Sequence, residues 1–93
     1  MKANDITHYR LSFRGRVQGV GFRFISAQIA KDFVVAGFVR NEPDGSVWLE
    51  VEGDRREIDS FIAKLKTQMS NNIVSCEMSE SKPKGFKDFI IER

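Results

Sequence analysis

The chain is poor in cysteine, proline and histidine: it contains one cysteine, two prolines and one histidine. The lone Cys76 excludes an internal disulfide bond and any metal site built from a cluster of cysteines. No apolar run approaches the roughly 20 residues that a transmembrane helix needs, and the N-terminus has no hydrophobic signal core. We therefore expect a cytoplasmic protein without a metal ion, a cofactor or a membrane partner.

Length and composition favour one small globular domain. The 93 residues predict a single domain over 1–93, in which 41% hydrophobic residues and eight phenylalanines form one modest core. Residues 1–6 are expected to be a flexible tail. The net charge of +2 permits an anionic ligand but is too small to indicate a nucleic-acid-binding protein by itself.

The most informative segment is 15–23, Gly-Arg-Val-Gln-Gly-Val-Gly-Phe-Arg, which lies between a strand pattern and a helical pattern. Glycine lets successive backbone amides turn inward, and a helix N-terminus presents unpaired N–H groups. Arg23 would add a planar donor fork in the first helical turn. The segment lacks the Lys-Ser/Thr of a Walker loop, and Phe24 stands where a dinucleotide fingerprint requires glycine. It therefore predicts a cradle for an anion such as phosphate.

The hydrophobic periodicities predict the order β-α-β-β-α-β followed by a terminal strand. The predicted strands are 8–14, 34–41, 46–52, 74–78 and 86–92. One helix follows the glycine-rich loop with an apolar stripe from Phe22 to Phe33. Asp54 caps the other helix, with Glu57 at the offset of a capping box. The turn Glu42-Pro43-Asp44-Gly45 joins the second and third strands.

This order predicts an α+β fold, the ferredoxin-like split βαβ sandwich. The sheet is expected to be mixed and mostly antiparallel, with two helices on one face. Five residues are expected on the other face: Arg10, Ser12, Phe38, Trp48 and Glu50. His8 falls on the polar phase of the first strand, so a solvated side chain is expected. Cys76 alternates with Val74 and Met78, which predicts a buried thiol.

The segment 15–23 resembles the signature loop of the acylphosphatases. The stretch 37–41, Gly-Phe-Val-Arg-Asn, followed by Asp-Gly-Ser-Val at 44–47, resembles the family's second motif. The resemblance runs from about residue 8 to the C-terminus in the expected element order. It implies metal-independent hydrolysis of a small-molecule acyl phosphate, by a monomer that binds no nucleic acid.

The resemblance also implies roles for individual residues. Arg23 matches the family's phosphate-binding arginine, and Asn41 matches the asparagine that holds the attacking water. The backbone amides of six residues match its phosphate cradle: Arg16, Val17, Gln18, Gly19, Val20 and Gly21. Asn41 would end a strand parallel to the first, at the same sheet edge as the loop. Inorganic phosphate or sulfate is expected to compete with substrate.

The chain departs from the family pattern at three places, and two other functions stay open. Phe38 stands where many members carry tryptophan, 31–34 lacks the usual glycine, and 66–72 lacks the usual Gly-Pro. One alternative is a nucleic-acid-binding module that stacks bases on Trp48 and Phe38, although strand 46–52 carries two acidic residues and no basic one. The other is a phosphate-binding domain without turnover.

Overall fold

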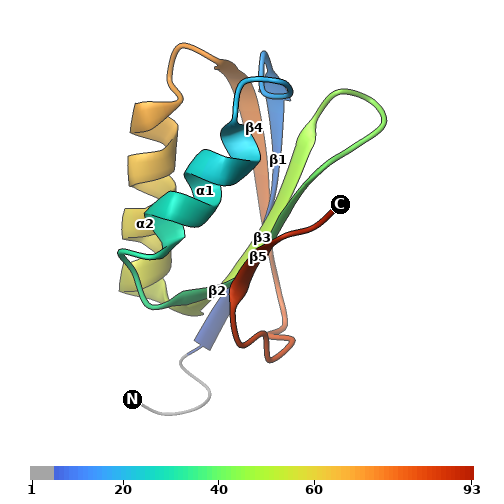
Figure 1. Cartoon of the computed structure of the whole chain (residues 1–93). Helices are drawn as coiled ribbons and strands as arrows, with labels where there is room; N and C mark the ends of the chain where they lie inside the picture. Colours follow the sequence, from blue (N-terminus) through green and yellow to red (C-terminus); the bar gives the residue numbers. More distant parts are fainter. Residues whose placement is uncertain (1–5) are drawn as a thin grey trace.

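The computed structural model describes residues 6–93. Five strands form one sheet, and two helices cover a single face of it (Figure 1). The elements in chain order are β1 (Ile6–Gly15), α1 (Phe22–Ala30), β2 (Val35–Asn41), β3 (Val47–Asp54), α2 (Arg55–Gln68), β4 (Ile73–Ser81) and β5 (Phe89–Ile91).

The strand order is β4-β1-β3-β2-β5, with antiparallel pairing everywhere except between β2 and β5, which are parallel. This confirms the predicted ferredoxin-like arrangement. Because β1 and β2 both pair antiparallel to β3, they run in the same direction. Gly15 and Asn41, the last residues of β1 and β2, therefore lie at the same edge of the sheet.

The core lies between the helices and the sheet. Its largest fully buried side chains include Phe13 of β1, Phe22 of α1 and Phe61 of α2. The rings of Phe13 and Phe22 lie 5.0 Å apart, which fastens the first turn of α1 to the sheet. Burying one such side chain contributes roughly 1.5–3 kcal/mol. The residue that follows Phe22, Arg23, is therefore carried by a rigidly seated helix start.

The sequence predicted the start of α2 and the end of α1 only in part. Asp54 caps α2 as expected, accepting a hydrogen bond of 2.9 Å from the Arg56 N–H. Glu57 does not complete a capping box; its carboxylate accepts from the Val34 N–H at 2.7 Å and ties α2 to the chain after α1. The end of α1 needs no left-handed glycine, because it closes with three short-range bonds, from the amides of Lys31, Asp32 and Phe33 to the carbonyls of Gln28, Ile29 and Ala30.

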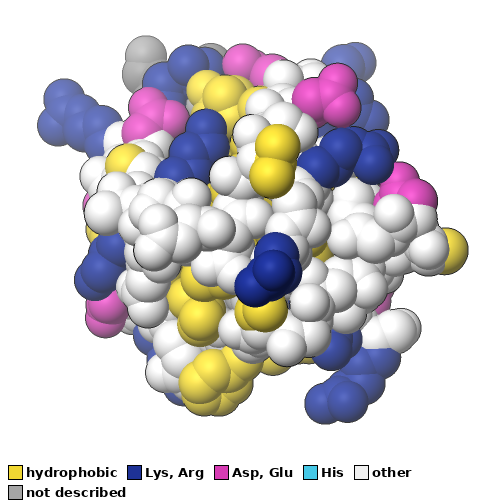
Figure 2. Space-filling model, turned by 90° about the horizontal axis from the view of Figure 1, so that it is seen from above, with side chains coloured by type: hydrophobic (Ala, Val, Ile, Leu, Met, Phe, Trp, Pro, Cys, Tyr) yellow, Lys and Arg dark blue, Asp and Glu magenta, His cyan; other side chains and the backbone are white. Residues whose placement is uncertain are grey.

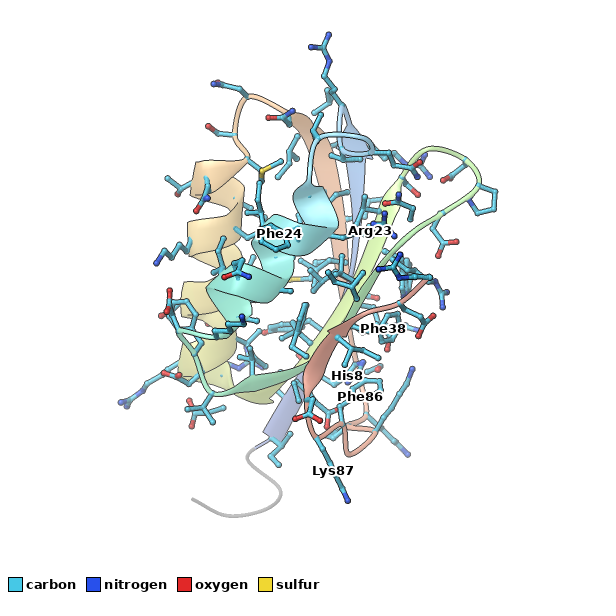
Figure 3. All side chains as sticks on the ribbon, viewed as in Figure 1. His8, Arg23, Phe24, Phe38, Phe86 and Lys87 are labelled. Atoms are coloured by element: carbon cyan, nitrogen blue, oxygen red, sulfur yellow. The ribbon has the colours of Figure 1, made fainter. Side chains whose placement is uncertain are left out.

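The expectation of a solvated His8 is wrong. Its side chain is fully buried, and its two ring nitrogens each lie 2.7 Å from a carboxylate, of Glu52 and of Glu50. The segment before β5 covers this part of the sheet: the Phe86 ring lies 5.7 Å from His8 and 5.8 Å, edge-on, from Phe38 (Figure 3). The alternation of polar and apolar residues therefore placed His8 on the correct face of the sheet, the one without helices. It could not show that the segment with Phe86 covers that face.

The expectation of a buried Cys76 thiol is also wrong. Its side chain is half-buried, and its neighbours in the alternation, Val74 and Met78, are 83% and 51% exposed. β4 is one of the two edge strands of the sheet, and neither helix packs closely over it. Burial still raises the pKa of the Cys76 thiol, which disfavours the reactive thiolate.

The chain start differs slightly from the expected tail of residues 1–6. β1 begins at Ile6, which pairs with Asp54 of β3. The rest of the expected tail lies outside the described residues. Within residues 6–93, no helix is long and apolar enough to cross a membrane.

Candidate functional site

The glycine-rich loop begins with a tight contact against the segment before β4. Gly15 has φ +130°, and a Cβ there would lie 2.3 Å from the Asn72 carbonyl oxygen. Next to it, the Arg16 N–H donates to the Asn72 carbonyl at 2.9 Å, and the Asn72 side-chain amide donates back to the Arg16 carbonyl at 3.0 Å. The segment that lacks the family's usual Gly-Pro therefore holds the start of the loop through Asn72.

The middle of the loop is fastened to the turn between β2 and β3. The Gln18 side-chain amide donates to the carbonyl oxygens of Glu42 and Ser46, both at 2.8 Å. Val17 is buried in the core beside it. These contacts keep the loop close to the end of β2, where Asn41 lies.

The loop ends at an uncapped helix N-terminus. Gly21 has φ +80° and is the N-cap of α1, no side chain caps the helix, and its first turn holds no acidic residue. The first N–H groups of such a helix lack intrahelical partners and attract anions. Glycine is required here because a left-handed φ strains other residues. Seen from above (Figure 2), this end of the molecule shows backbone and polar surface among basic and apolar side chains, with acidic ones toward the rim.

Arg23 lies in the first turn of this helix. Its side chain is half-buried and forms no ion pair with any residue in 6–93. A cation in this position opposes the helix dipole. The positive charge of Arg23 therefore adds to that of the helix terminus and would be stabilised by a bound anion.

One cavity of about 270 Å³ joins the predicted site residues. It is lined by Val17, Gly19, Gly21, Phe22, Arg23, Phe24, Asn41, Ile91 and Arg93. The structure thus brings Arg23 and Asn41 to the same cavity as the loop, from α1 and β2. Three of the predicted cradle residues do not line it: Arg16, Gln18 and Val20. The Arg16 amide is already engaged by Asn72.

Sequence reasoning missed several features of this region, including the role of the Gln18 side chain, although Gln18 itself was predicted as a cradle residue. Phe24, Ile91 and Arg93 line the cavity, while Gln18 and Asn72 support the loop through their side chains. Phe24 could have been predicted as a site residue, because it directly follows Arg23 in the sequence. The contacts of Gln18 and Asn72 join segments far apart in the chain, so no local pattern predicts them.

Two other arginines near the site, Arg40 and Arg14, are paired with carboxylates. Hydrogen bonds to Glu92 and Glu42 raise the pKa of Arg40 and tie the end of β5 to β2. Hydrogen bonds from Ser46 lower the pKa of Asp44, and the nearby Arg14 guanidinium at 3.2 Å adds to this effect. Arg40 and Arg14 are thus occupied by carboxylates, in contrast to Arg23.

The described residues 6–93 contain no group of three or more His, Cys, Asp or Glu side chains arranged to hold a metal ion. The polar groups that this arrangement offers are backbone amides, the guanidinium groups of Arg23 and Arg93, and the carboxamide of Asn41. Such groups hold a phosphate, distribute its charge and orient a water molecule.

Comparison with known proteins finds the acylphosphatase family, whose profile matches residues 9–91. An acylphosphatase of Thermotoga maritima is 34% identical over 84 residues, 89% of this chain and 93% of its own. One of Methanothrix thermoacetophila is 39% identical, covering 88% of this chain and 92% of its own. The crystal structure of acylphosphatase from Bacillus subtilis matches with a TM-score of 0.84 and 32% identity, over 94% of this chain and 99% of that one.

Proposed function

This chain belongs to the acylphosphatase family and is an acyl phosphate hydrolase, and from this premise we propose that the cavity between the loop, α1 and β2 is its active site. The observation that supports the proposal most directly is that Arg23 and Asn41, from separate motifs, line one cavity together with Gly19 and Gly21. The substrate is a small-molecule acyl phosphate, and the enzyme works without a metal ion.

The phosphoryl group is held by backbone amides and by Arg23. In this assignment the cradle consists of the amides of Val17, Gly19 and Gly21, the loop residues that line the cavity. The Arg16 amide is excluded because it donates to Asn72. The uncapped start of α1 adds its own N–H groups. The Arg23 guanidinium binds two phosphoryl oxygens and stabilises their charge as the transition state forms.

Asn41 orients the attacking water. Its carboxamide oxygen accepts a hydrogen bond from a water in line with the bond between phosphorus and the acyl oxygen. The water oxygen attacks phosphorus, that bond breaks, and the carboxylate leaves with the electron pair. A carboxamide is too weak a base to take the water proton, so a phosphoryl oxygen receives it and inorganic phosphate is formed.

The hydrogen bonds around the loop keep these groups in place. Gln18 ties the loop to the β2–β3 turn, and Asn72 ties its start to the segment before β4. Small displacements of positioning groups reduce rates strongly. Gln18 and Asn72 are therefore positioning residues, and neither contacts the substrate through its side chain.

The alternative of a base-stacking module loses its main support. Phe38 is only 8% exposed beneath Phe86, and the Trp48 indole N–H donates to Glu50 at 2.8 Å. A phosphate-binding domain without turnover differs from the enzyme only in activity. We further propose a cytoplasmic monomer in which residues 1–93 form one domain and inorganic phosphate or sulfate competes with substrate.

Hydrolysis of benzoyl phosphate tests the proposal. Phosphate release is measured before and after exhaustive chelation, and again in the presence of sulfate. The expected result is turnover that chelation does not change and that sulfate inhibits competitively. Loss of activity on chelation, with recovery on adding Mg²⁺ or Zn²⁺, would contradict the metal-independent mechanism; no turnover at all would favour the non-catalytic alternative.

A further inference from the structure

Phe24 is an exposed aromatic residue inside the proposed active site. Its side chain is 61% exposed, and it lines the same cavity as Arg23 and Asn41. The other large apolar side chains that are exposed all lie outside this cavity: Ile6, Val34, Val74, Met78 and Ile90. A single exposed apolar residue needs no explanation by itself, but one that borders a reaction site offers its surface to the substrate.

Three successive residues at the start of α1, Phe22, Arg23 and Phe24, point in different directions. Residues that follow one another on a helix point about 100° apart. Phe22 enters the core against Phe13, while Figure 3 shows Arg23 and Phe24 on different sides of the first turn. Phe24 has no aromatic partner within residues 6–93. Most of the Phe24 side chain is thus exposed and is not stacked on another aromatic ring of these residues.

The geometry of in-line displacement relates Phe24 to the leaving group. The water held by Asn41 and the departing carboxylate lie on opposite sides of phosphorus. Asn41 comes from β2, whereas Phe24 comes from α1, and both line the cavity that the loop borders. An acyl group that leaves on the side away from Asn41 leaves toward α1, where Phe24 is the most exposed of the large apolar side chains that line the cavity.

We propose that Phe24 forms an acyl-binding subsite and makes this enzyme prefer acyl phosphates with an apolar, preferably aromatic, acyl group. This inference rests on the proposed function. An aromatic ring contacts a benzoyl group by offset or edge-to-face packing, and a methyl group offers far less area. The phosphate contacts are common to all substrates, so Phe24 determines specificity and not phosphate affinity.

The test compares benzoyl phosphate with acetyl phosphate in the wild-type enzyme, Phe24→Ala and Phe24→Leu. Wild type is expected to have the higher kcat/KM for benzoyl phosphate. Phe24→Ala should lower that value about fivefold to tenfold while leaving acetyl phosphate within about twofold, since one apolar contact in a pocket changes rates by roughly 10- to 200-fold when fully enclosed and less at an open rim. Phe24→Leu should restore part of the preference.

Ile90→Ala is the matched control, because Ile90 is 52% exposed and lies outside the cavity. It should change the kcat/KM of neither substrate. A melting curve and the Ki for inorganic phosphate should be unchanged in Phe24→Ala. If Phe24→Ala leaves the ratio of kcat/KM for benzoyl phosphate to kcat/KM for acetyl phosphate unchanged, whether or not both values fall, the proposed subsite is wrong. A wild-type preference for an acyl phosphate with a second, distal carboxylate would also overturn the subsite and would point to Arg93 instead.

Ligand binding, measured without turnover, tests the acyl-binding subsite independently of catalysis. Phenylphosphonate should raise the melting temperature of wild type more than methylphosphonate does at equal concentration, and Phe24→Ala should remove the difference. If wild type hydrolyses neither substrate but binds both phosphonates, the proposed function fails and the phosphonate comparison still decides the subsite. Equal shifts by the two phosphonates would contradict the role of Phe24 whatever the activity.

Discussion

Asn72 and Arg16 are joined by two hydrogen bonds, one from the Arg16 N–H to the Asn72 carbonyl at 2.9 Å and one from the Asn72 side-chain amide to the Arg16 carbonyl at 3.0 Å. The two residues lie 56 positions apart in the chain. Their contact fixes where the loop leaves β1, next to the close approach at Gly15. The proposed phosphate cradle therefore depends on the segment before β4 as well as on its own glycines.

Asn72→Ala should weaken this support without removing it, because the backbone hydrogen bond remains. One lost hydrogen bond costs about 1 kcal/mol of unfolding free energy. We expect a lower melting temperature and a decrease of about fivefold in kcat/KM, accompanied by a higher Ki for phosphate. Asn71→Ala, at the exposed neighbouring position, is the control and should behave as wild type. Wild-type kinetics in Asn72→Ala would mean that the loop holds its shape unaided.

Gln18→Ala removes the two hydrogen bonds that connect the loop to the β2–β3 turn. The account predicts a decrease in kcat of about tenfold or more, because a small displacement of the loop relative to Asn41 spoils the alignment of water and phosphate. Gln18→Glu should be at least as impaired at neutral pH, since a carboxylate cannot donate to the carbonyl oxygens of Glu42 and Ser46. Steady-state kinetics with benzoyl phosphate measure both; full activity in Gln18→Glu would refute the positioning role.

Arg23→Ala should reduce kcat/KM roughly 100-fold, because a charge-assisted bidentate contact is lost. This corresponds to about 3 kcal/mol of transition-state stabilisation. Arg23→Lys should recover only part of the activity, since lysine lacks the planar fork. The stabilisation of the fold by sulfate should disappear in Arg23→Ala, as read from melting temperatures. Arg56→Ala, an exposed arginine on α2, controls for the loss of net charge and should retain both properties.

The buried group around His8 predicts a loss of stability in acid. Burial raises the pKa of Glu50 and Glu52, but hydrogen bonds from Lys84, Trp48 and His8 to Glu50, and from His8 and the 84–86 amides to Glu52, outweigh it and lower both pKa values. Carboxyls with a lowered folded-state pKa stabilise the fold above the unfolded value of about 4.3. That contribution is lost as the pH falls through the lower folded-state pKa.

Glu52→Gln tests this acid dependence by urea unfolding between pH 7 and pH 3. The variant should lose about 2 kcal/mol at pH 7, because an amide replaces a carboxylate that accepts several hydrogen bonds. Its stability should then change less with pH than that of wild type. Glu77→Gln, on the exposed edge strand β4, is the control and should keep the wild-type slope. A parallel pH dependence in Glu52→Gln and wild type would contradict the assignment.

The sequence predicted the parts of this protein that depend on local patterns. Strand alternation, the helical stripe after Phe22 and the glycine-rich loop were sufficient for the fold. Two motifs predicted Arg23 and Asn41 as site residues, and both line one cavity. The buried His8 was missed because its cover, Phe86, comes from the far end of the chain. The contacts of Gln18 and Asn72 were missed for the same reason: each joins a loop residue to a segment distant in sequence.

Asn41→Ala tests the central claim most directly, because the account separates the water-positioning residue from the phosphate-binding ones. The measurement is kcat together with the Ki for inorganic phosphate, on one sample whose melting curve shows that it is folded. We expect kcat to fall by a factor of 100 or more, on the order of 3 kcal/mol, with Ki within about twofold of wild type. A Ki that rises as far as kcat falls would contradict the account, because Asn41 would then be a phosphate-binding residue.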